Sequence, residues 1–425
     1  NRISLIPVSS GPPHFRGDTV PSLGGTCILD LTSMKRIIRV DRKNRVVMFE
    51  PGVTFGELEE AAEKEGIRLN MPLLPRQSKS VLGSLLEREP VLMPKYQWDI
   101  ADPLTCIEVV VGTGEVMRTG SAAGPGDIEE QWRSGGAQKE AAGPSAASWY
   151  RVIQGAQGTM GVVTWATARC EVLPRLESPF FVGASSIERL LPMVHWLIRL
   201  RLANECFILN ARNFSLIASS LGLVDGMRMK REIPSWVLFF NLAAYDYLPE
   251  ERLSGLIEDT MEISKDLGLE PQKVLWKLRA EDFLQSVRRP CPEPYWKLLF
   301  GGCEDVFFLA RWEKIPGHLR TMAGLVERGG YPFRELGVYI QPLVQGTTYH
   351  VEFNLFFEAR QAERVSRIAR ASVTALLQEG AFFSRPYGHQ ARMIVMRDAA
   401  QVEILKKVKQ ILDPSGIMNP GKLCF

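Results

Sequence analysis

Short apolar runs, broken by glycine and by polar turns, make up the first 173 residues of the chain. Residues 37–40 and 46–50 are apolar and β-branched and flank a polar turn, so we expect them to pair as a hairpin. Residues 55–65 carry apolar side chains at helical spacing, with Thr54 as the N-cap and Gly66 as the stop signal. This part of the chain is therefore predicted to consist of short strands with one clear helix.

The pattern changes after about residue 179, where longer apolar strands alternate with amphipathic helices. Their order includes a β-α-β-β-α unit, which predicts an antiparallel sheet with helices on one face and hence an α+β arrangement. The predicted strands are residues 236–245, 306–312, 336–341 and 348–357, and the predicted helices are residues 250–267, 316–328 and 359–379.

Side chains alternate in character along the last predicted strand. His350, Glu352 and Asn354 fall on one face, and apolar side chains fall on the other. Tyr339 and Gln341 share a face of the preceding strand and extend the same polar surface. Such a surface lines a cavity in some proteins and faces solvent in others, so the sequence leaves both interpretations open.

Composition narrows the class of protein. The chain has 425 residues, of which 45% are hydrophobic and 23% charged, values typical of a globular protein with two domains. A net charge of +3 is too small to indicate a nucleic-acid partner, and no run approaches the roughly 20 apolar residues of a membrane span. The seven cysteines are scattered without a CxxC pair, which argues against zinc or an iron–sulfur cluster and predicts a reducing, cytoplasmic location.

Several motifs containing glycine follow one another along the chain. The motifs are Gly24-Gly25-Thr26 with Leu29-Asp30-Leu31, Glu50-Pro51-Gly52-Val53-Thr54, Gln157-Gly158-Thr159-Met160-Gly161-Val162-Val163-Thr164, and Leu412-Asp413-Pro414-Ser415-Gly416-Ile417-Met418-Asn419-Pro420-Gly421-Lys422. Their order resembles that of the FAD-binding family of vanillyl-alcohol oxidase, p-cresol methylhydroxylase (PCMH) and the glycolate/D-lactate dehydrogenase flavoproteins.

The resemblance implies a PCMH-type FAD-binding domain of two α+β subdomains, with an inserted cap built on an antiparallel sheet covered by helices. We expect residues 1–178 to form the FAD-binding domain without the beginning of the family's domain, residues 179–378 to form the cap, and residues 379–425 to return to the FAD-binding domain. The cofactor-binding residues implied by the resemblance are Ser9, Ser10, Gly11, His14, Gly83, Ser84, Gly155, Gly158, Thr159, Gly161, Val162, Asn419 and Lys422.

Two segments depart from the family pattern. Pro12 and Pro13 stand in the first glycine-rich loop, and each removes a backbone donor that a pyrophosphate would use. Only Gly83 and Ser84 remain of the second glycine-rich loop, and a charged triplet follows them. His14 aligns with a position at which some members bond FAD covalently, and an ordinary loop histidine is the alternative.

A further resemblance concerns the residues expected to contact the substrate. Residues 384–389 resemble a Tyr-Arg-Thr-His-like run of the alkylphenol branch, with Arg385 at the arginine. A guanidinium there can hold a carboxylate or stabilise the reduced flavin ring. Tyr387 can polarise a substrate oxygen and His389 can accept a proton, although a surface histidine is the alternative for the latter. The catalytic residues we predict are Arg385, Tyr387, His389, His350 and Glu352.

The metal motif of the glycolate/D-lactate branch is incomplete in this chain. His350 corresponds to its second histidine, but Leu343 occupies the place of the first. One histidine and one carboxylate make a poor site for zinc or manganese. We therefore predict no catalytic metal.

Together these features predict an FAD-dependent dehydrogenase or oxidase. Hydride would pass from a hydroxy acid, or from an aromatic alcohol or phenol, to flavin N5, and electrons would pass to a separate acceptor such as an iron–sulfur protein or an electron-transfer flavoprotein. We expect an anionic or aromatic small-molecule substrate and an oligomer or complex subunit, with no nucleic acid and no membrane span. The alternative is a flavin-binding or flavin-free scaffold subunit of a multi-subunit electron-transfer complex, because a fold does not guarantee chemistry.

Overall fold

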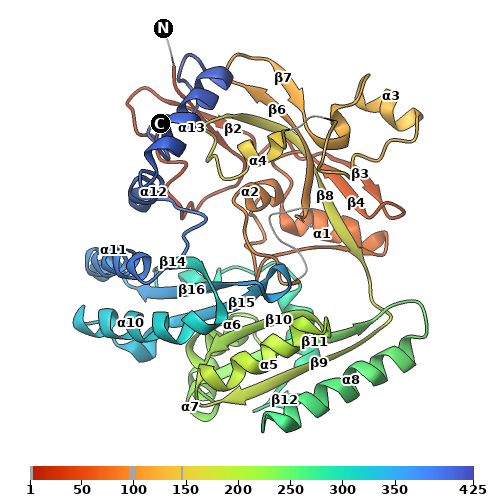
Figure 1. Cartoon of the computed structure of the whole chain (residues 1–425), viewed down its shortest axis with the longest axis vertical. Helices are drawn as coiled ribbons and strands as arrows, with labels where there is room; N and C mark the ends of the chain where they lie inside the picture. Colours follow the sequence, from red (N-terminus) through yellow and green to blue (C-terminus); the bar gives the residue numbers. More distant parts are fainter. Residues whose placement is uncertain (1–2, 95–101, 145–146) are drawn as a thin grey trace.

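The computed structural model describes residues 3–94, 102–144 and 147–425, and it divides into an upper and a lower half, each centred on a six-stranded antiparallel sheet (Figure 1). The upper half contains the chain up to β8 and the C-terminal helices, and the lower half contains the elements between them. The upper sheet consists of β3 (Ile37–Asp41), β4 (Val46–Phe49), β5 (Ile67–Leu69), β6 (Leu104–Val111), β7 (Val116–Arg118) and β8 (Gly161–Val172).

Strand β8 is the centre of the upper sheet, since it pairs with β4, β5 and β6. Its β-branched residues suit a pleated strand that is buried along most of its length. The predicted helix is α1, and Thr54 and Glu57 form a capping box at its start. The helices of this half are α1 (Phe55–Lys64), α2 (Val81–Leu86), α3 (Ile128–Arg133), α4 (Trp149–Ile153), α12 (Gly388–Val395) and α13 (Ala399–Leu412).

The lower sheet has the strand order β14-β16-β15-β10-β11-β9, and all its neighbouring strands are antiparallel. One face packs against α5, α8, α10 and α11 in the larger apolar core. The strands are β9 (Leu176–Ala184), β10 (Ala203–Asn210), β11 (Trp236–Ala244), β14 (Gly302–Ala310), β15 (Gly337–Leu343) and β16 (Thr348–Phe357). The helices on this face are α5 (Ile187–Arg199), α8 (Pro249–Asp266), α10 (Ile315–Arg328) and α11 (Ala362–Gln378).

Helices also lie on the second face of the lower sheet, which differs from the one-faced arrangement predicted from the sequence. The helices α6 (Ala211–Ser220) and α9 (Ala280–Val287) pack there in a second apolar core. The sequence did not predict them because α6 is buried on most sides and has little contrast between faces, while α9 is short. They do not cover the whole of this face. Strands β14, β16 and β15, at one end of the sheet, face the upper half instead.

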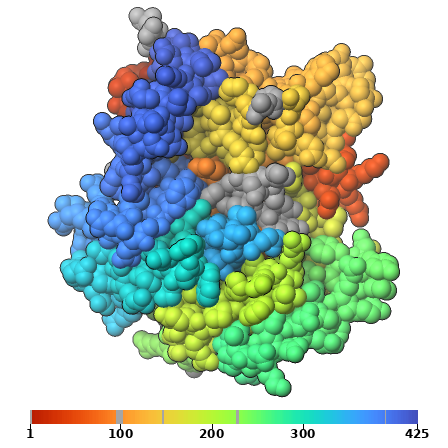
Figure 2. All heavy atoms as spheres, viewed as in Figure 1, coloured from red at the N-terminus to blue at the C-terminus, as the bar shows by residue number. Residues whose placement is uncertain are grey.

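The two ends of the chain lie together in the upper half. Leu5 in β1 (Leu5–Val8) forms a parallel bridge with Met418, while β1 also pairs with β2 (Cys27–Asp30). The backbone N–H of Asn419 donates to the carbonyl of Leu5 at 2.8 Å. Figure 2 shows the C-terminal segment running along the edge of both halves. Among the residues described, no helix combines the length and the apolar character needed to cross a lipid bilayer.

A buried ion pair joins the halves away from their shared cavity. Arg68 in β5 donates to Glu205 in β10 at 2.6 Å, and Arg288 lies 2.7 Å from the same carboxylate. Burial raises the pKa of Glu205, but the two guanidinium groups outweigh this effect and lower the pKa to about 2. A carboxylate in this setting is ionised in the folded protein at neutral pH.

We expect Glu205→Gln to lower the free energy of unfolding by about 3–5 kcal/mol, because the change leaves a buried guanidinium without its charge partner. The pKa of Glu205 is depressed on folding, so its stabilisation is complete above the unfolded value of about 4.3 and is lost as the pH falls from there towards 2. Urea unfolding at neutral pH and between pH 5 and 2 measures both effects.

The matched control is Asp246→Asn, which breaks an exposed 2.7 Å pair with Arg175. Exposed pairs contribute at most about 1 kcal/mol. A loss for Glu205→Gln that does not exceed the loss for this control would contradict the prediction.

Candidate active site

A cavity lies where the two halves face one another. It encloses about 1770 Å³ counted to its open mouth. Its walls come from residues 7–19, 72–90, 153–163 and 295–305, and from side chains of β15, β16 and the C-terminal segment.

The first loop presents free backbone donors at this cavity. Arg76 donates to the carbonyls of Gly11 at 3.3 Å and Pro12 at 3.1 Å. Ser10 accepts a hydrogen bond from the backbone N–H of Ser80 through its hydroxyl. Within the described part of the chain, the backbone N–H groups of Ser9, Ser10 and Gly11 donate to no other group. Unpaired amides in a loop are suited to binding an anion, so the two prolines weaken this site without removing it.

The third motif and the C-terminal motif meet at Asn419. Its side-chain N–H group donates to the carbonyls of Gln157 at 2.6 Å and Asp18 at 2.9 Å, which ties three segments together. Its amide oxygen is buried and has no partner among the described groups. Gly158 has φ +72°, and a Cβ at this position would lie 2.7 Å from the Pro7 ring. Glycine is therefore required for the third motif to approach the first loop.

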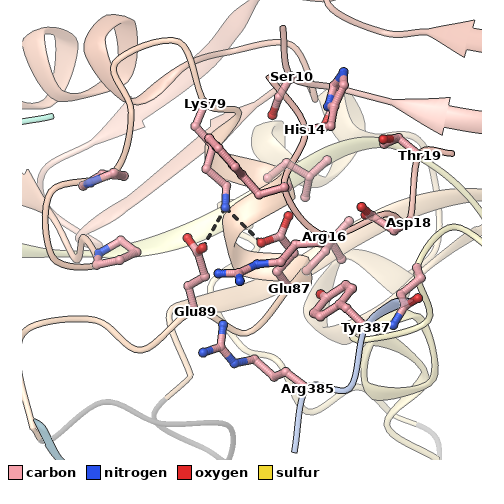
Figure 3. A pocket seen from close by; sticks show the side chains of 18 of the residues that line it. Ser10, His14, Arg16, Asp18, Thr19, Lys79, Glu87, Glu89, Arg385 and Tyr387 are labelled. Atoms are coloured by element: carbon pink, nitrogen blue, oxygen red, sulfur yellow. Dashed lines mark hydrogen bonds and ion pairs between the residues drawn. The ribbon is translucent and has the colours of Figure 1, made fainter. Parts of the chain in front are cut away.

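Charged side chains occupy the place of the second glycine-rich loop. Lys79 lies 2.9 Å from Glu87 and 2.8 Å from Glu89, and Figure 3 shows its ammonium between the two carboxylates with Arg16 and Arg385 beside them. Arg88, at φ +57°, turns away and donates to the carbonyl of Ser384 at 2.7 Å. The charged triplet thus directs two acids into the cavity and one cation out of it.

The lower half contributes a hydrogen-bonded group that we name the lower-half cluster: Lys297, Asp305, His350, Glu352 and Asn354. Lys297 donates to Glu352 at 2.5 Å and to Asp305 at 2.7 Å, and Asn354 donates to both carboxylates at 2.7 Å. The Nε2 atom of His350 lies 3.3 Å from Glu352. Burial raises the pKa of Glu352, but Lys297 outweighs it and holds the pKa well below its usual range. Burial lowers the pKa of His350.

Two arginines flank Phe307 from different parts of the chain. Arg16, in the first loop, lies 4.7 Å from the ring centre and pairs with Asp305 at 3.3 Å. Arg385 lies 4.3 Å from the same ring centre and is 5% exposed. Its Nη1 atom is buried and has no partner among the described residues, and burial lowers the pKa of its guanidinium. Arg385 is therefore a buried cation with a free donor, and such a group fits an anionic ligand.

The structure brings many of the residues predicted from the sequence to this cavity, while others do not line it. Lys422, for example, donates to the carbonyls of Gly17 and Val20, and Ser84 donates to Glu89. The side chain of His389, in α12, lies outside the described residues. Those lining the cavity are Ser9, Ser10, His14, Gly83, Gly158, Gly161, His350, Glu352, Arg385, Tyr387 and Asn419. Those that do not line it are Gly11, Ser84, Gly155, Thr159, Val162 and Lys422.

Sequence reasoning missed Arg16, Lys79, Lys297 and Asp305, which all line the cavity. Asp305 had a detectable signal in the sequence. It lies two residues before Phe307 near the start of strand β14, so the two side chains fall on the same face of that strand. Lys297 had none, since it lies in a short 3₁₀ turn between elements. Within the ranges that the structure describes, no group of three or more His, Cys, Asp or Glu side chains is arranged to hold a metal ion.

Comparison with known proteins gives two family matches at opposite ends of the chain. Residues 1–120 match the FAD binding domain, and residues 387–423 match the C-terminal domain of FAD linked oxidases. The chain is 23% identical to D-lactate dehydrogenase (cytochrome), mitochondrial, of Arabidopsis thaliana, over 99% of this chain and 69% of that protein. It is 22% identical to D-lactate dehydrogenase of Anaerostipes hadrus, over 100% of this chain and 85% of that protein.

The fold is also that of a solved flavoprotein. The 4-ethylphenol oxidase from Gulosibacter chungangensis, in complex with isoeugenol, superposes with a TM-score of 0.80 at 19% identity, over 99% of this chain and 84% of that one. This likeness concerns the fold alone. Both ends of the chain match models of FAD-linked proteins, and the chain is an FAD-dependent oxidoreductase with the fold of the PCMH-type flavoproteins.

Proposed function

We propose that the chain takes hydride from a small hydroxy acid, or from an aromatic alcohol or phenol, and passes the electrons to a separate acceptor. The observation that carries this proposal is the free donor of buried Arg385 in the same cavity as the His350–Glu352 pair. An anion anchor beside a proton acceptor is what oxidation of an anionic alcohol requires. The relatives named for D-lactate and 4-ethylphenol support both substrate classes.

The residues around the cavity fit FAD. The unpaired amides of Ser9 and Ser10 are suited to the pyrophosphate, and the free amide oxygen of Asn419 can accept from an N–H group of the cofactor. Bound FAD supplies the hydride acceptor of the reaction. The role of the protein is to hold that cofactor and the substrate in one dry space.

Arg385 is proposed to hold the substrate. Its guanidinium offers planar donors to a carboxylate or to a phenolate oxygen, and its burial strengthens that attraction. Tyr387, buried beside it and lining the same cavity, is proposed to donate to a substrate oxygen. These contacts would orient the C–H bond that is to be broken.

His350 is proposed to accept the proton of the substrate hydroxyl. It is 1% exposed, and burial lowers the pKa of its imidazole, so the ring is neutral near pH 7. Glu352 accepts from its Nε2 atom and fixes the orientation of the ring. A neutral, oriented imidazole can take up a proton as the C–H bond breaks.

The electron acceptor is proposed to be a separate protein. The name of the Arabidopsis relative associates its reaction with a cytochrome, which supports a protein acceptor for this chain as well.

His14 is exposed, and its ring lines the cavity, so a covalent link to the flavin and a free imidazole both fit. Acid denaturation separates the two cases. Flavin absorbance that stays with the polypeptide, and that is lost in His14→Ala, would identify the link. Complete release of flavin from the unsubstituted chain would exclude it.

We expect Gly158→Ala to reduce FAD binding at least about tenfold. The new Cβ would meet Pro7 at 2.7 Å and would displace the first loop, in addition to straining a residue at φ +72°. The matched control is Gly114→Ala, at φ +88° with open space around it, which carries backbone strain only. Titration of the apoprotein with FAD measures both affinities, and equal affinities in the two variants would contradict this assignment.

We expect Arg385→Ala to slow substrate-driven flavin reduction by about 10–100-fold, the value of one or two charge-assisted hydrogen bonds. Its FAD content should match that of the unsubstituted protein, and Arg385→Lys should recover part of the rate. Stopped-flow absorbance at the visible flavin band measures the rate for a panel of hydroxy acids and phenols. Arg320→Ala, at an exposed surface site, is the control. Reduction at an unchanged rate would remove Arg385 from the proposed mechanism.

A further inference from the structure

Lys297 is a buried cation that the proposed chemistry has not yet used. It is 9% exposed and lies at the cavity wall within 2.7 Å of two carboxylates. Burying an ammonium group costs free energy, so a buried lysine is found where carboxylates compensate its charge. The charges around it come from Glu352 in β16, Asp305 in β14 and Arg16 in the first loop.

Lys297 is the cation that contacts the carboxylate partner of His350. Arg16 and Lys297 carry two positive charges, and Asp305 and Glu352 carry two negative charges. The remaining groups that face the imidazole are Tyr339, whose ring centre lies 5.5 Å away, and the guanidinium of Arg385, which adds a third positive charge. With three cations against two carboxylates, the imidazole gains no net attraction for a proton.

The hydrogen bonds also define which ring nitrogen carries the proton. Glu352 accepts from Lys297 and Asn354 through Oε1, and its Oε2 atom faces Nε2 of His350 at 3.3 Å. A carboxylate in this position can only accept, so Nε2 of the neutral ring must be the donor. The lone pair then lies on Nδ1, which is the nitrogen left to act as a base.

We propose that Lys297 is a positioning residue which holds Glu352 ionised and thereby keeps His350 neutral, with Nδ1 as the proton acceptor. The inference rests on the proposed function, because it assigns the base of that reaction. Removal of the ammonium takes away the cation in contact with Glu352, so the His350–Glu352 pair binds a proton more tightly. That proton sits on the imidazole or on Glu352, and in either case Nδ1 carries hydrogen and loses its lone pair.

The first test is the pH dependence of substrate-driven flavin reduction in Lys297→Met. The acid limb of the rate profile should move up by at least one pH unit, which is a loss of at least about tenfold at pH values below both limbs and recovers at alkaline pH. Lys79→Met removes the other lysine of the cavity, which pairs with Glu87 and Glu89, and should leave the position of that limb unchanged. A rate that falls equally at every pH in Lys297→Met would overturn the inference.

The second test does not depend on turnover. Nitrogen-15 NMR of labelled imidazoles in the FAD-loaded protein reports the tautomer of His350, assigned with His350→Gln among only five histidines. The unsubstituted protein should have a neutral ring protonated at Nε2 at pH 7, and Lys297→Met should have hydrogen on Nδ1. The same tautomer in both proteins would refute the role of Lys297, even if no substrate were found and the proposed function had failed.

Chemical rescue separates the charge of Lys297 from its bulk. Lys297→Ala leaves space beside the two carboxylates that ethylammonium can enter. A neutral solute of similar size can fill the same space but cannot restore the charge. We expect ethylamine hydrochloride to return the acid limb towards its original position, and isopropanol at the same concentration to have no such effect. Equal effects of both additives would show that packing, and not charge, explains the defect.

Discussion

Charge burial between the two halves is the constraint on which the rest of the structure depends. A buried charge without a partner costs several kcal/mol, so each one must meet an opposite charge at close range. Arg68 meets Glu205 and Arg16 meets Asp305, and in both pairs the partners belong to different halves. The halves are therefore aligned by ion pairs on two sides of the cavity, and the cavity keeps its shape between them.

The exceptions to this pairing lie along the cavity. Lys79, Lys297 and Arg16 each contact a carboxylate, whereas Arg385 has a buried nitrogen without a described partner. The unpaired amides of the first loop are a second exception. Unsatisfied donors at two places along one cavity match a long anionic cofactor and a small anionic substrate, which is the combination that the family relationship predicts.

The sequence predicted the elements near the cavity better than the contacts within it. Residues 55–65 were predicted as a helix because Thr54, Glu57 and Gly66 act locally, and the polar face of β16 followed from its alternation. The helix α6 was missed because apolar side chains on most of its sides leave little contrast between faces, and α9 was missed because it is short. The motifs identified the FAD-binding family because glycine is required wherever the backbone approaches closely, as at Gly158.

The sequence by itself thus determined the family, the cofactor and the polar strand, since each depends on residue types at short spacing. Only the tertiary structure decided that Glu87 and Glu89 point into the cavity while Arg88 points out, and that Lys297 joins His350 through Glu352. Lys297 and Glu352 are 55 residues apart, and Arg16 and Asp305 are 289 residues apart. Charges at such separations meet only after the chain has folded, because their attraction in water is too weak and too short in range to leave a pattern in the sequence.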